Sequence, residues 1–340
     1  MSTPPALSPP IDAIVLISFG GPERREDVLP FLENVVRGRR VPEERLLEVA
    51  EHYDLFDGVS PINGENRALL AALLAELNAH GRTIPVYWGN RNWHPLLEDT
   101  VAEMAADGVR HALALVTSAF GSYSGCRQYL EDIDRAVEAA GPSAPRIDKL
   151  RLFYNHPGFI EAMADRVRQG LETLPAERRG EAVVVFTAHS VPIAMADAGP
   201  YVAQLHEACR LTAEQAGCGP WQLAYQSRSG PPQQAWIEPD VGDWLLERHR
   251  QSPVESLIVV PIGFLCDHIE VVYDLDVELA ALCDELGINM VRCGTVGRHP
   301  RFVAMVRELI EERLDPSRPR QVIGRFPAWP DQCPPGCCRK

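Results

Sequence analysis

One histidine and one acidic stretch are the parts of this sequence best suited to proton and metal chemistry. His189 comes two positions after the apolar run 183–187, which predicts a buried strand, so its imidazole is expected at the rim of a sheet. Glu270, Asp274 and Glu278 recur every four residues and therefore share one face of a predicted helix. A neutral imidazole accepts protons near physiological pH, and carboxylates bind divalent cations. Together, His189 and Glu270 would complete a nitrogen-and-oxygen site for a divalent metal.

Each of these features also has a plainer explanation that the sequence leaves open. A histidine after a strand can simply hydrogen-bond to loop backbone, and acids on one helix face can form a solvated surface. Like charges at this spacing repel one another, however, and solvation alone does not explain that cost. Ser60 lies in a turn-rich segment where its hydroxyl could hold a carboxylate, and an ordinary Asn/Pro loop is the alternative.

The elements that must position these side chains alternate between strands and helices. Strand patterns cover residues 13–17, 86–89, 112–118, 183–187, 223–226 and 257–262, and helix patterns cover residues 23–36, 96–107, 127–140, 202–216, 270–285 and 301–313. This alternation predicts parallel sheets covered by helices. We therefore expect an α/β protein of two doubly wound domains, joined near residues 146–153, with the last helix packing back on the first domain.

The predicted strand ends indicate where a ligand binds. In open parallel sheets, ligands bind beyond the carboxyl ends of the strands. Phe19, residues 118–123, His189 and residues 267–270 all lie at such ends, and they come from both halves of the chain. The sequence thus predicts a site in a cleft between the two domains.

Composition and charge exclude several other classes of protein. The chain has 340 residues, with 33 Lys and Arg against 47 Asp and Glu, which gives a formal charge of −14. That charge argues against a nucleic-acid-binding surface. No apolar run approaches the roughly 20 residues of a membrane-spanning helix, and residues 1–10 lack the features of a secretion signal, so we expect a cytoplasmic protein. The dinucleotide and P-loop patterns are absent, which disfavours nucleotide binding.

The cysteines are distributed unevenly. Nine cysteines without a secretion signal favour reduced thiols or metal ligation over disulfides. Three of them, Cys333, Cys337 and Cys338, lie close together in a segment rich in Pro and Gly. Such a segment has little apolar surface to bury, so this cluster suggests a metal.

Five short strings, spread over nearly the whole chain, carry a family resemblance. They are Leu16-Ile-Ser-Phe-Gly-Gly-Pro22, Gly58-Val-Ser-Pro-Ile-Asn-Gly64, Thr187-Ala-His-Ser-Val-Pro192, Gln226-Ser-Arg228 and Pro261-Ile-Gly-Phe264, the last continuing to Asp267-His-Ile-Glu-Val-Val-Tyr-Asp-Leu-Asp276. Together and in this order, they resemble the ferrochelatases, which insert ferrous iron into a porphyrin in haem synthesis.

The resemblance implies a fold and a set of site residues. It implies two Rossmann-like domains with four-stranded parallel sheets of the chelatase type and a porphyrin between them. The first domain would comprise residues 11–150 and 305–340, and the second residues 151–304. By position, the family's metal pair corresponds to His189 and Glu270, its acidic metal-leading helix to Asp274 and Glu278, and its propionate-holding positions to Ser60 and Tyr129, with Tyr53 in the same loop region. Phe19 stands where some soluble members carry a tyrosine.

The chain also resembles one branch of this family, found in high-GC Gram-positive bacteria. That resemblance rests on Tyr123-Ser-Gly-Cys-Arg-Gln-Tyr129 and on the cysteine-rich tail. It implies coproporphyrin as substrate and a two-iron, two-sulfur (2Fe-2S) cluster held by Cys126, Cys333, Cys337 and Cys338. Zinc held by four thiolates is the rival metal. Cys209 and Cys218 are the next candidates for the fourth ligand.

The expected function is insertion of ferrous iron into coproporphyrin III to give Fe-coproporphyrin (coprohaem). Within the same class, the alternatives are protoporphyrin IX as substrate or another metal such as cobalt. A porphyrin or haem carrier without catalysis is the alternative from another class, and it would need neither His189 nor Glu270. Expected partners are the porphyrin, Fe²⁺ and other enzymes of haem synthesis, with no nucleic acid and no membrane-spanning segment.

Overall fold

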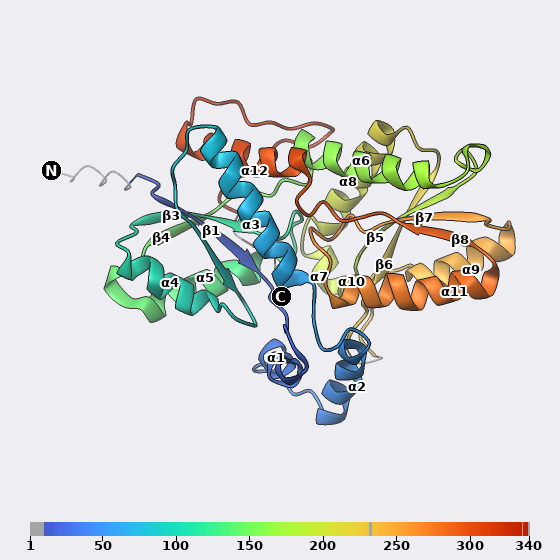
Figure 1. The fold of residues 1–340 in the computed structure, drawn as a ribbon, viewed down its shortest axis with the longest axis horizontal. Helices are drawn as coiled ribbons and strands as arrows, with labels where there is room; N and C mark the ends of the chain where they lie inside the picture. The colour runs from blue at the N-terminus through green and yellow to red at the C-terminus, as the bar shows by residue number, and fades with distance from the viewer. Residues whose placement is uncertain (1–9, 231–232, 335, 339–340) are drawn as a thin grey trace.

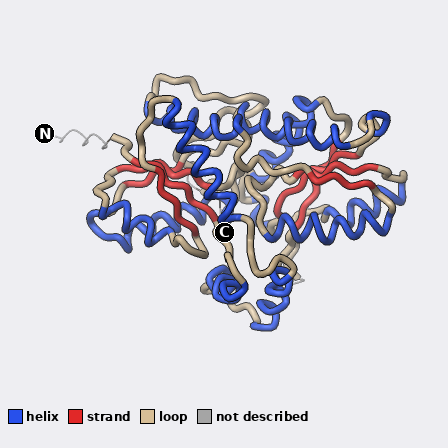
Figure 2. The backbone as a smooth tube through the Cα atoms, in the orientation of Figure 1, coloured by secondary structure: helices blue, strands red, loops and turns tan. Residues whose placement is uncertain are grey.

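The computed structural model of the protein, which describes residues 10–230, 233–334 and 336–338, contains two four-stranded sheets (Figure 1; Figure 2). Their strand orders are β2-β1-β3-β4 and β6-β5-β7-β8, and all pairs of neighbouring strands are parallel. The strands are β1 (Ala13–Ser18), β2 (Val86–Asn90), β3 (His111–Val116), β4 (Arg146–Lys149), β5 (Val183–His189), β6 (Trp221–Gln226), β7 (Ser256–Val260) and β8 (Asn289–Arg292). The expected α/β class with two doubly wound sheets is confirmed.

Helices cover both faces of each sheet, as Figure 1 shows. One layer, common to both sheets, contains α3 (Ile62–Ala79), α6 (Pro157–Thr173), α8 (Tyr201–Ala216) and α12 (Pro300–Leu314). On the opposite faces lie α4 (Leu97–Ala106) and α5 (Gln128–Ala140) for the first sheet, and α9 (Val241–Gln251), α10 (Ile269–Tyr273) and α11 (Ala280–Leu286) for the second. The short helix α7 (Ile193–Asp197) follows β5.

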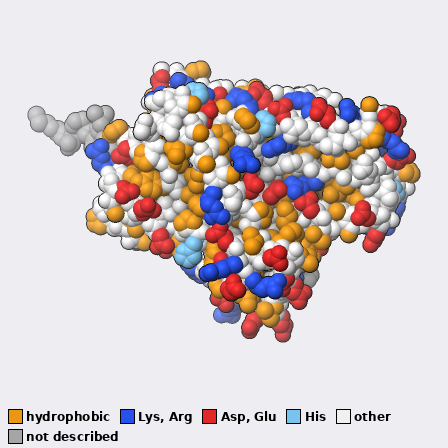
Figure 3. All heavy atoms as spheres, in the orientation of Figure 1, with side chains coloured by type: hydrophobic (Ala, Val, Ile, Leu, Met, Phe, Trp, Pro, Cys, Tyr) orange, Lys and Arg blue, Asp and Glu red, His pale blue; other side chains and the backbone are white. Residues whose placement is uncertain are grey.

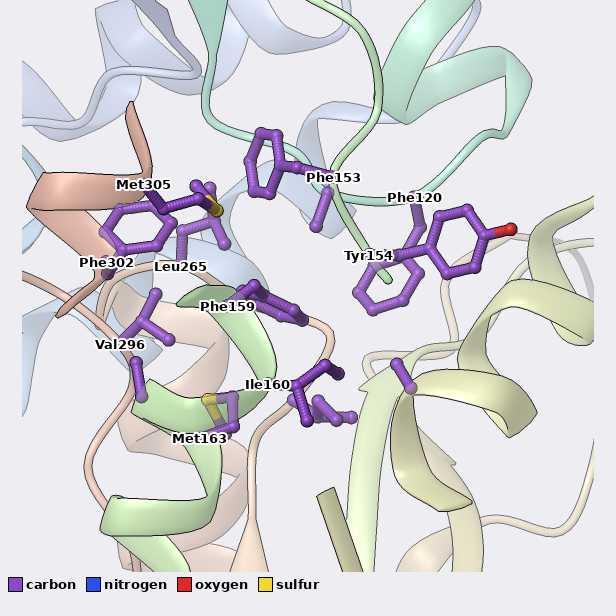
Figure 4. Close-up of a cluster of buried hydrophobic side chains, with 14 of the residues drawn as sticks. Phe120, Phe153, Tyr154, Phe159, Ile160, Met163, Leu265, Val296, Phe302 and Met305 are labelled. Carbon is purple, nitrogen blue, oxygen red and sulfur yellow. The ribbon is translucent and has the colours of Figure 1, made fainter. Parts of the chain in front are cut away.

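One continuous hydrophobic core joins the two halves. Alternate side chains of β1 point to opposite faces, so Ile14 and Leu16 enter the shared core while Ala13, Val15 and Ile17 pack against α4 and α5. The second sheet contributes its own residues to the same shared core. In Figure 4, Phe120 of the first half and Phe153 and Tyr154 of the connection between the halves pack against residues of α6 and α12. The two sheets are therefore fixed relative to each other by packing.

A small lobe projects beside the second half (Figure 1). It consists of α1 (Val28–Val35) and α2 (Glu43–Asp54) and belongs in sequence to the first half. Phe31 of α1 packs in one cluster with Ile269 of α10, and the rings of His52 and Tyr273 stack with centroids 3.9 Å apart. The lobe therefore connects the first half to the start of the acidic helix.

Three predicted elements differ from the structure in detail. The helix expected at residues 270–285 is present as α10, a π-helical turn η5 (Asp274–Leu279) and α11 in unbroken succession, so the spacing of four residues no longer stacks Glu278 directly over Asp274. The helix expected from residue 23 begins only at Val28, after a 3₁₀ turn, because Glu23 forms a β-bridge with Val59. Residues 146–149 form β4 rather than a joint, and the connection between the halves follows them.

The character of the helices and the distribution of charge on the surface bear on the predicted class of protein. Within the described part of the chain, no helix combines the length and the apolar character needed to cross a lipid bilayer. On the face drawn in Figure 3, acidic and basic side chains alternate instead of gathering by sign.

Candidate active site and thiol cluster

His189 is the last residue of β5, and its imidazole is held by the loop that follows the strand. Nδ1 contacts the carbonyl oxygen of Ser190, and the hydroxyl of Tyr201 donates to the carbonyl of His189 at 3.0 Å. Because a carbonyl oxygen only accepts, Nδ1 must carry the hydrogen of the neutral ring. Nε2 then has the free lone pair, so His189 is oriented as a base.

Glu270 lies in the first turn of α10, opposite His189. Its Oε2 is 3.6 Å from Nε2 of His189, and the Glu270 side chain is 51% exposed. The distance exceeds that of a hydrogen bond, but the two groups share one side of the site. The structure thus brings together the two residues that the sequence pairs, one from a strand end and one from a helix start. His268, which the sequence reasoning did not select, is half-buried in the same segment, and desolvation lowers the pKa of its imidazole.

Asp274 is held more tightly than the sequence pattern suggested. Its Oδ2 accepts a hydrogen bond from Nε2 of Gln226 at 3.2 Å and another from the hydroxyl of Ser227. Burial raises the pKa of Asp274 to about 7, and the two hydrogen bonds only partly oppose that rise. Ser227 adopts a positive φ of 60°, which a non-glycine residue rarely does, to make this contact. Glu278 is four residues further along the π-turn.

The candidate porphyrin-binding residues of the first half are mostly buried. Ser60 is 4% exposed and Tyr129 is 5% exposed, and the guanidinium carbon of Arg91 lies 3.7 Å from the centre of the Tyr129 ring. Tyr53 packs edge-on against Phe31, and burial raises the pKa of its hydroxyl. Phe19, at 36% exposure, is the most open of the four candidates. Arg91 was missed because an arginine after a strand carries no distinctive pattern.

The four candidate cluster cysteines meet in space. Sγ of Cys126 is 4.0 Å from Sγ of Cys333, and Sγ of Cys337 is 3.6 Å from Sγ of Cys338. The two pairs lie close enough that Cys338 influences the pKa of Cys126 and Cys333 influences that of Cys337. Cys126 is in the π-helical turn η2 (Tyr123–Arg127), more than 200 residues before the tail cysteines. Cys209 is fully buried inside the shared core instead, and Cys218 belongs to the partly buried residues packed against it.

The surroundings of these thiols raise their pKa overall, but they also contain groups that favour the thiolate. The Cys126 thiol and burial raise the pKa of Cys333, and the indole nitrogen of Trp329, which is buried without a hydrogen-bond acceptor, acts to lower it. Lys149, 8% exposed, acts in the same direction on Cys126 and Cys333. Across the residues that the structure describes, no set of three or more His, Cys, Asp and Glu side chains is arranged to hold a single metal ion. The thiols fall instead into close pairs.

The architecture defines a class before any sequence comparison. The arrangement of two parallel sheets with covering helices resembles that of known chelatases. The sirohydrochlorin chelatase of Bacillus subtilis subspecies spizizenii, solved with cobalt, matches with a TM-score of 0.51 at 15% identity and covers 89% of this chain and 94% of its own. The terminal siroheme-synthesis enzyme of denitrifying bacteria matches with a TM-score of 0.51 at 14% identity over 89% and 100%. These likenesses show a chelatase fold.

Sequence comparison then gives the family. The ferrochelatase family model matches residues 11–314. A ferrochelatase of Rhodopirellula baltica is 52% identical over 97% of this chain and 94% of its own. Coproporphyrin III ferrochelatases of Nocardia farcinica and Mycolicibacterium smegmatis are 52% identical over 96% of both chains and 53% identical over 93% and 94%, respectively. The chain belongs to the ferrochelatase family, which confirms the resemblance drawn from its motifs.

Proposed function

We propose that this ferrochelatase inserts Fe²⁺ into coproporphyrin III to give Fe-coproporphyrin, with His189 and Glu270 as the groups that handle protons and metal. The observation that carries the proposal is the 3.6 Å approach of His189 Nε2 to Glu270 Oε2, because it joins a base and a carboxylate at the end of a parallel sheet. Relatives at about half identity, named coproporphyrin III ferrochelatase, support the choice of substrate.

The chemistry follows from the protons that the reaction releases. A free-base porphyrin carries two pyrrole N–H protons in its plane, so the metal enters only as the ring bends and those protons leave. Nε2 of His189 is the free acceptor on this side of the site, and the Ser190 carbonyl keeps the ring oriented. Glu270 is the more exposed partner and is placed to present Fe²⁺ or to take a proton onward.

The acidic residues beyond Glu270 supply a route for the metal. Glu270, Asp274 and Glu278 form no ion pair with lysine or arginine within the described residues, so no such side chain competes with a metal cation for them. Oxygen ligands of this kind suit divalent cations that exchange readily. We assign Asp274 and Glu278 to delivery of Fe²⁺ and Glu270 to its final transfer.

The first half supplies the residues that hold the ring. Ser60 and Tyr129 are assigned to the propionates, and Tyr53 and Phe19 to packing against the macrocycle. Gly21 approaches Ser60 so closely that a Cβ there would lie 2.7 Å from the Ser60 Cβ, which fixes the position of this hydroxyl. Ser60→Ala should therefore raise the KM for porphyrin with little change in kcat.

The porphyrin preference is tested by measuring iron insertion under anaerobic conditions with each porphyrin, followed by loss of the free-base spectrum. Coproporphyrin has four propionates and protoporphyrin two, and each hydrogen bond to a charged group contributes about 1.5–3 kcal/mol. We expect a specificity constant about tenfold or more higher for coproporphyrin. Equal specificity constants would overturn the substrate assignment. Tight porphyrin binding with an unchanged free-base spectrum would identify a carrier instead.

We further propose that Cys126, Cys333, Cys337 and Cys338 hold a 2Fe-2S cluster. Two close thiol pairs suit two irons with two thiolates each, whereas a single zinc ion would need four sulfurs around one point. When bound, the group supplies thiolate–metal bonds that fasten the C-terminal segment to η2. Purified protein should be brown and contain sulfide. Colourless protein containing zinc would refute the cluster.

The remaining expectations of the sequence are kept as proposals. We place the domain boundary after residue 150, because the strands of the first sheet lie in residues 13–149 and those of the second in residues 183–292. The C-terminal helix α12 packs against α3 of the first half and also against α6 of the second. Location in the cytoplasm and contact with other enzymes of haem synthesis complete the proposal.

A further inference from the structure

Arg292, the last residue of β8, makes an unusually complete set of contacts with the acidic segment. Nε and Nη2 donate to the two carboxylate oxygens of Asp276 at 2.8 and 2.7 Å. Nη1 donates to both oxygens of Asp267 at 3.1 and 3.0 Å. The Arg292 side chain is only 17% exposed. Two-pronged contacts between a guanidinium and carboxylates fix direction as well as distance.

The two carboxylates that Arg292 holds lie on either side of the residues assigned to iron. Asp267 is in the loop before α10, three positions ahead of Glu270. Asp276 is in the π-turn, two positions after Asp274. One guanidinium therefore clamps both flanks of the segment that contains Glu270 and Asp274.

A π-turn depends on such support. Its i→i+5 hydrogen bonds are uncommon in proteins and usually occur as single turns at functional sites. Here the turn is held from both edge strands of the second sheet: β6 ends at Gln226, which binds Asp274, and β8 ends at Arg292, which binds Asp276. Between these edges, β5 ends at His189. The turn is thus fixed relative to the base that it must serve.

Arg292 also neutralises some of the acidic residues in this segment and, among the described residues, leaves the others without a lysine or arginine partner. Five carboxylates lie between Asp267 and Glu278, and Arg292 neutralises two of them. The other three are those assigned to Fe²⁺. Without Arg292, Asp267 and Asp276 would become unpaired carboxylates beside the metal route and would compete for the cation.

We propose that Arg292 is a positioning residue for iron delivery: it holds the π-turn so that Glu270, Asp274 and Glu278 face the incoming Fe²⁺, and it keeps Asp267 and Asp276 from binding that ion. The proposal rests on the proposed function of the acidic segment. Arg292 makes its contacts with the protein, so its effect must show in the use of iron and not in porphyrin binding.

The test compares Arg292→Met with wild type in anaerobic steady-state kinetics, varying Fe²⁺ and coproporphyrin separately. We expect the KM for Fe²⁺ to rise about tenfold, with kcat within about threefold and porphyrin affinity unchanged. Backbone amides of residues 274–279 should exchange hydrogen faster. Arg292→Lys keeps the positive charge but loses the two-pronged guanidinium contact, so its KM for Fe²⁺ should lie between those of wild type and Arg292→Met. An unchanged KM for Fe²⁺ in Arg292→Met would overturn the proposal.

A matched control separates positioning from general stability. Arg210 is likewise held between two carboxylates, Glu207 and Glu214, and is similarly buried at 21% exposure, but on α8. Arg210→Met should lower the melting temperature without changing the KM for Fe²⁺. An equal rise in that KM in both variants would reduce Arg292 to a structural residue.

Two further variants keep the outcome clear. If Arg292→Met fails to fold, the triple variant with Asp267→Asn and Asp276→Asn removes the unpaired charges, and it should still show a raised KM for Fe²⁺. Glu270→Gln tests the proposed function separately. If Glu270→Gln loses activity but the folded triple variant has a normal KM for Fe²⁺, the proposed role of Arg292 is refuted and the proposed function stands. If Glu270→Gln keeps full activity, the proposed role of the acidic segment in iron delivery is refuted.

Discussion

The two sheets have the same strand order, yet their central strands end in different chemistry. β1 ends at Ser18 and is followed by Phe19, whereas the equivalent strand β5 ends at His189. A phenyl ring can only pack against a ligand, while an imidazole with a free Nε2 can take a proton. The fold therefore supplies two equivalent positions, and under the proposed function the side chain at each decides whether that position packs against the ring or takes a proton.

A second likeness between the halves lies at their edge strands. After β3 the chain forms the π-turn η2 with Cys126, and after β7 it forms, beyond α10, the π-turn η5 with Asp274. In each half the next strand ends in a cation. Cys333 and Lys149, the last residue of β4, act against the raised pKa of Cys126, and Arg292, the last residue of β8, clamps η5. Under the proposed function, this arrangement provides sulfur ligands in the first half and carboxylates in the second, two ligand types that select different metals.

The largest expected effect comes from removing the reactive groups at the end of β5 and the start of α10. His189→Ala and Glu270→Gln should each lower the rate of iron insertion by about 10²–10⁴-fold, because each removes a proton-handling group. Porphyrin should still bind, as measured by quenching of its fluorescence. Phe19→Ala, the change at the equivalent end, should mainly raise the KM for porphyrin. Near-normal turnover in either of the first two variants would contradict the assignment.

The thiolate side of the comparison is tested by Cys126→Ser. A serine hydroxyl is a poor ligand for the soft site, so the variant should lose its visible absorption and its bound sulfide. The C-terminal segment should then become more open to proteolysis. Cys283→Ser, at a buried cysteine in the core of the second half, should keep the full spectrum. A full spectrum in Cys126→Ser would contradict the assignment of Cys126 as a cluster ligand.

The connection between the halves should show a pH dependence of stability. Burial, with the charges of Arg151 and Arg301, lowers the pKa of His156 from 6.5 to about 3, while the unfolded chain keeps the ordinary value. As the pH falls from 6.5 towards 3, the unfolded state takes up a proton that the folded state refuses. The free energy of unfolding therefore falls on this account, by at most about 5 kcal/mol.

His156→Asn isolates this contribution. Asparagine keeps an acceptor for the Gly158 N–H at the start of α6 but does not titrate. Denaturant melts from pH 7.5 to 4 should give a shallower loss of stability for the variant than for wild type. If the free energy of unfolding falls equally with pH in both proteins, His156 does not contribute to the loss of stability in acid.

The smallest expected effect concerns Phe19→Tyr, which adds a polar group at the end of β1. The ring is partly exposed and packs edge-on against Phe31 with centroids 6.2 Å apart, so the hydroxyl can reach solvent or ligand without disturbing the core. We expect a change in kcat of less than about threefold. A change as large as that of His189→Ala would mean that both strand ends take part in the chemistry.

Periodicity and turn residues predicted most strands and several helices because buried β-branched runs and apolar helix faces are local signals. The position of His189 after β5 followed from the same signals. The π-turn at Asp274 could not be predicted, because Gln226, Ser227 and Arg292 from distant strands stabilise it. Nor does spacing bring Cys126 to Cys333. The family resemblance suggested that meeting, and the path of the tail past α8 produces it.

The central claim is that a divalent ion enters at the carboxylates and histidine of the second half and not at the thiolates of the first. Zinc X-ray absorption, with substoichiometric Zn²⁺ added to the cluster-loaded protein without porphyrin, tests this directly. The account predicts only nitrogen and oxygen ligands at about 2.0–2.2 Å, with imidazole scattering that disappears in His189→Ala. A sulfur shell at about 2.3 Å in the wild-type protein would contradict it.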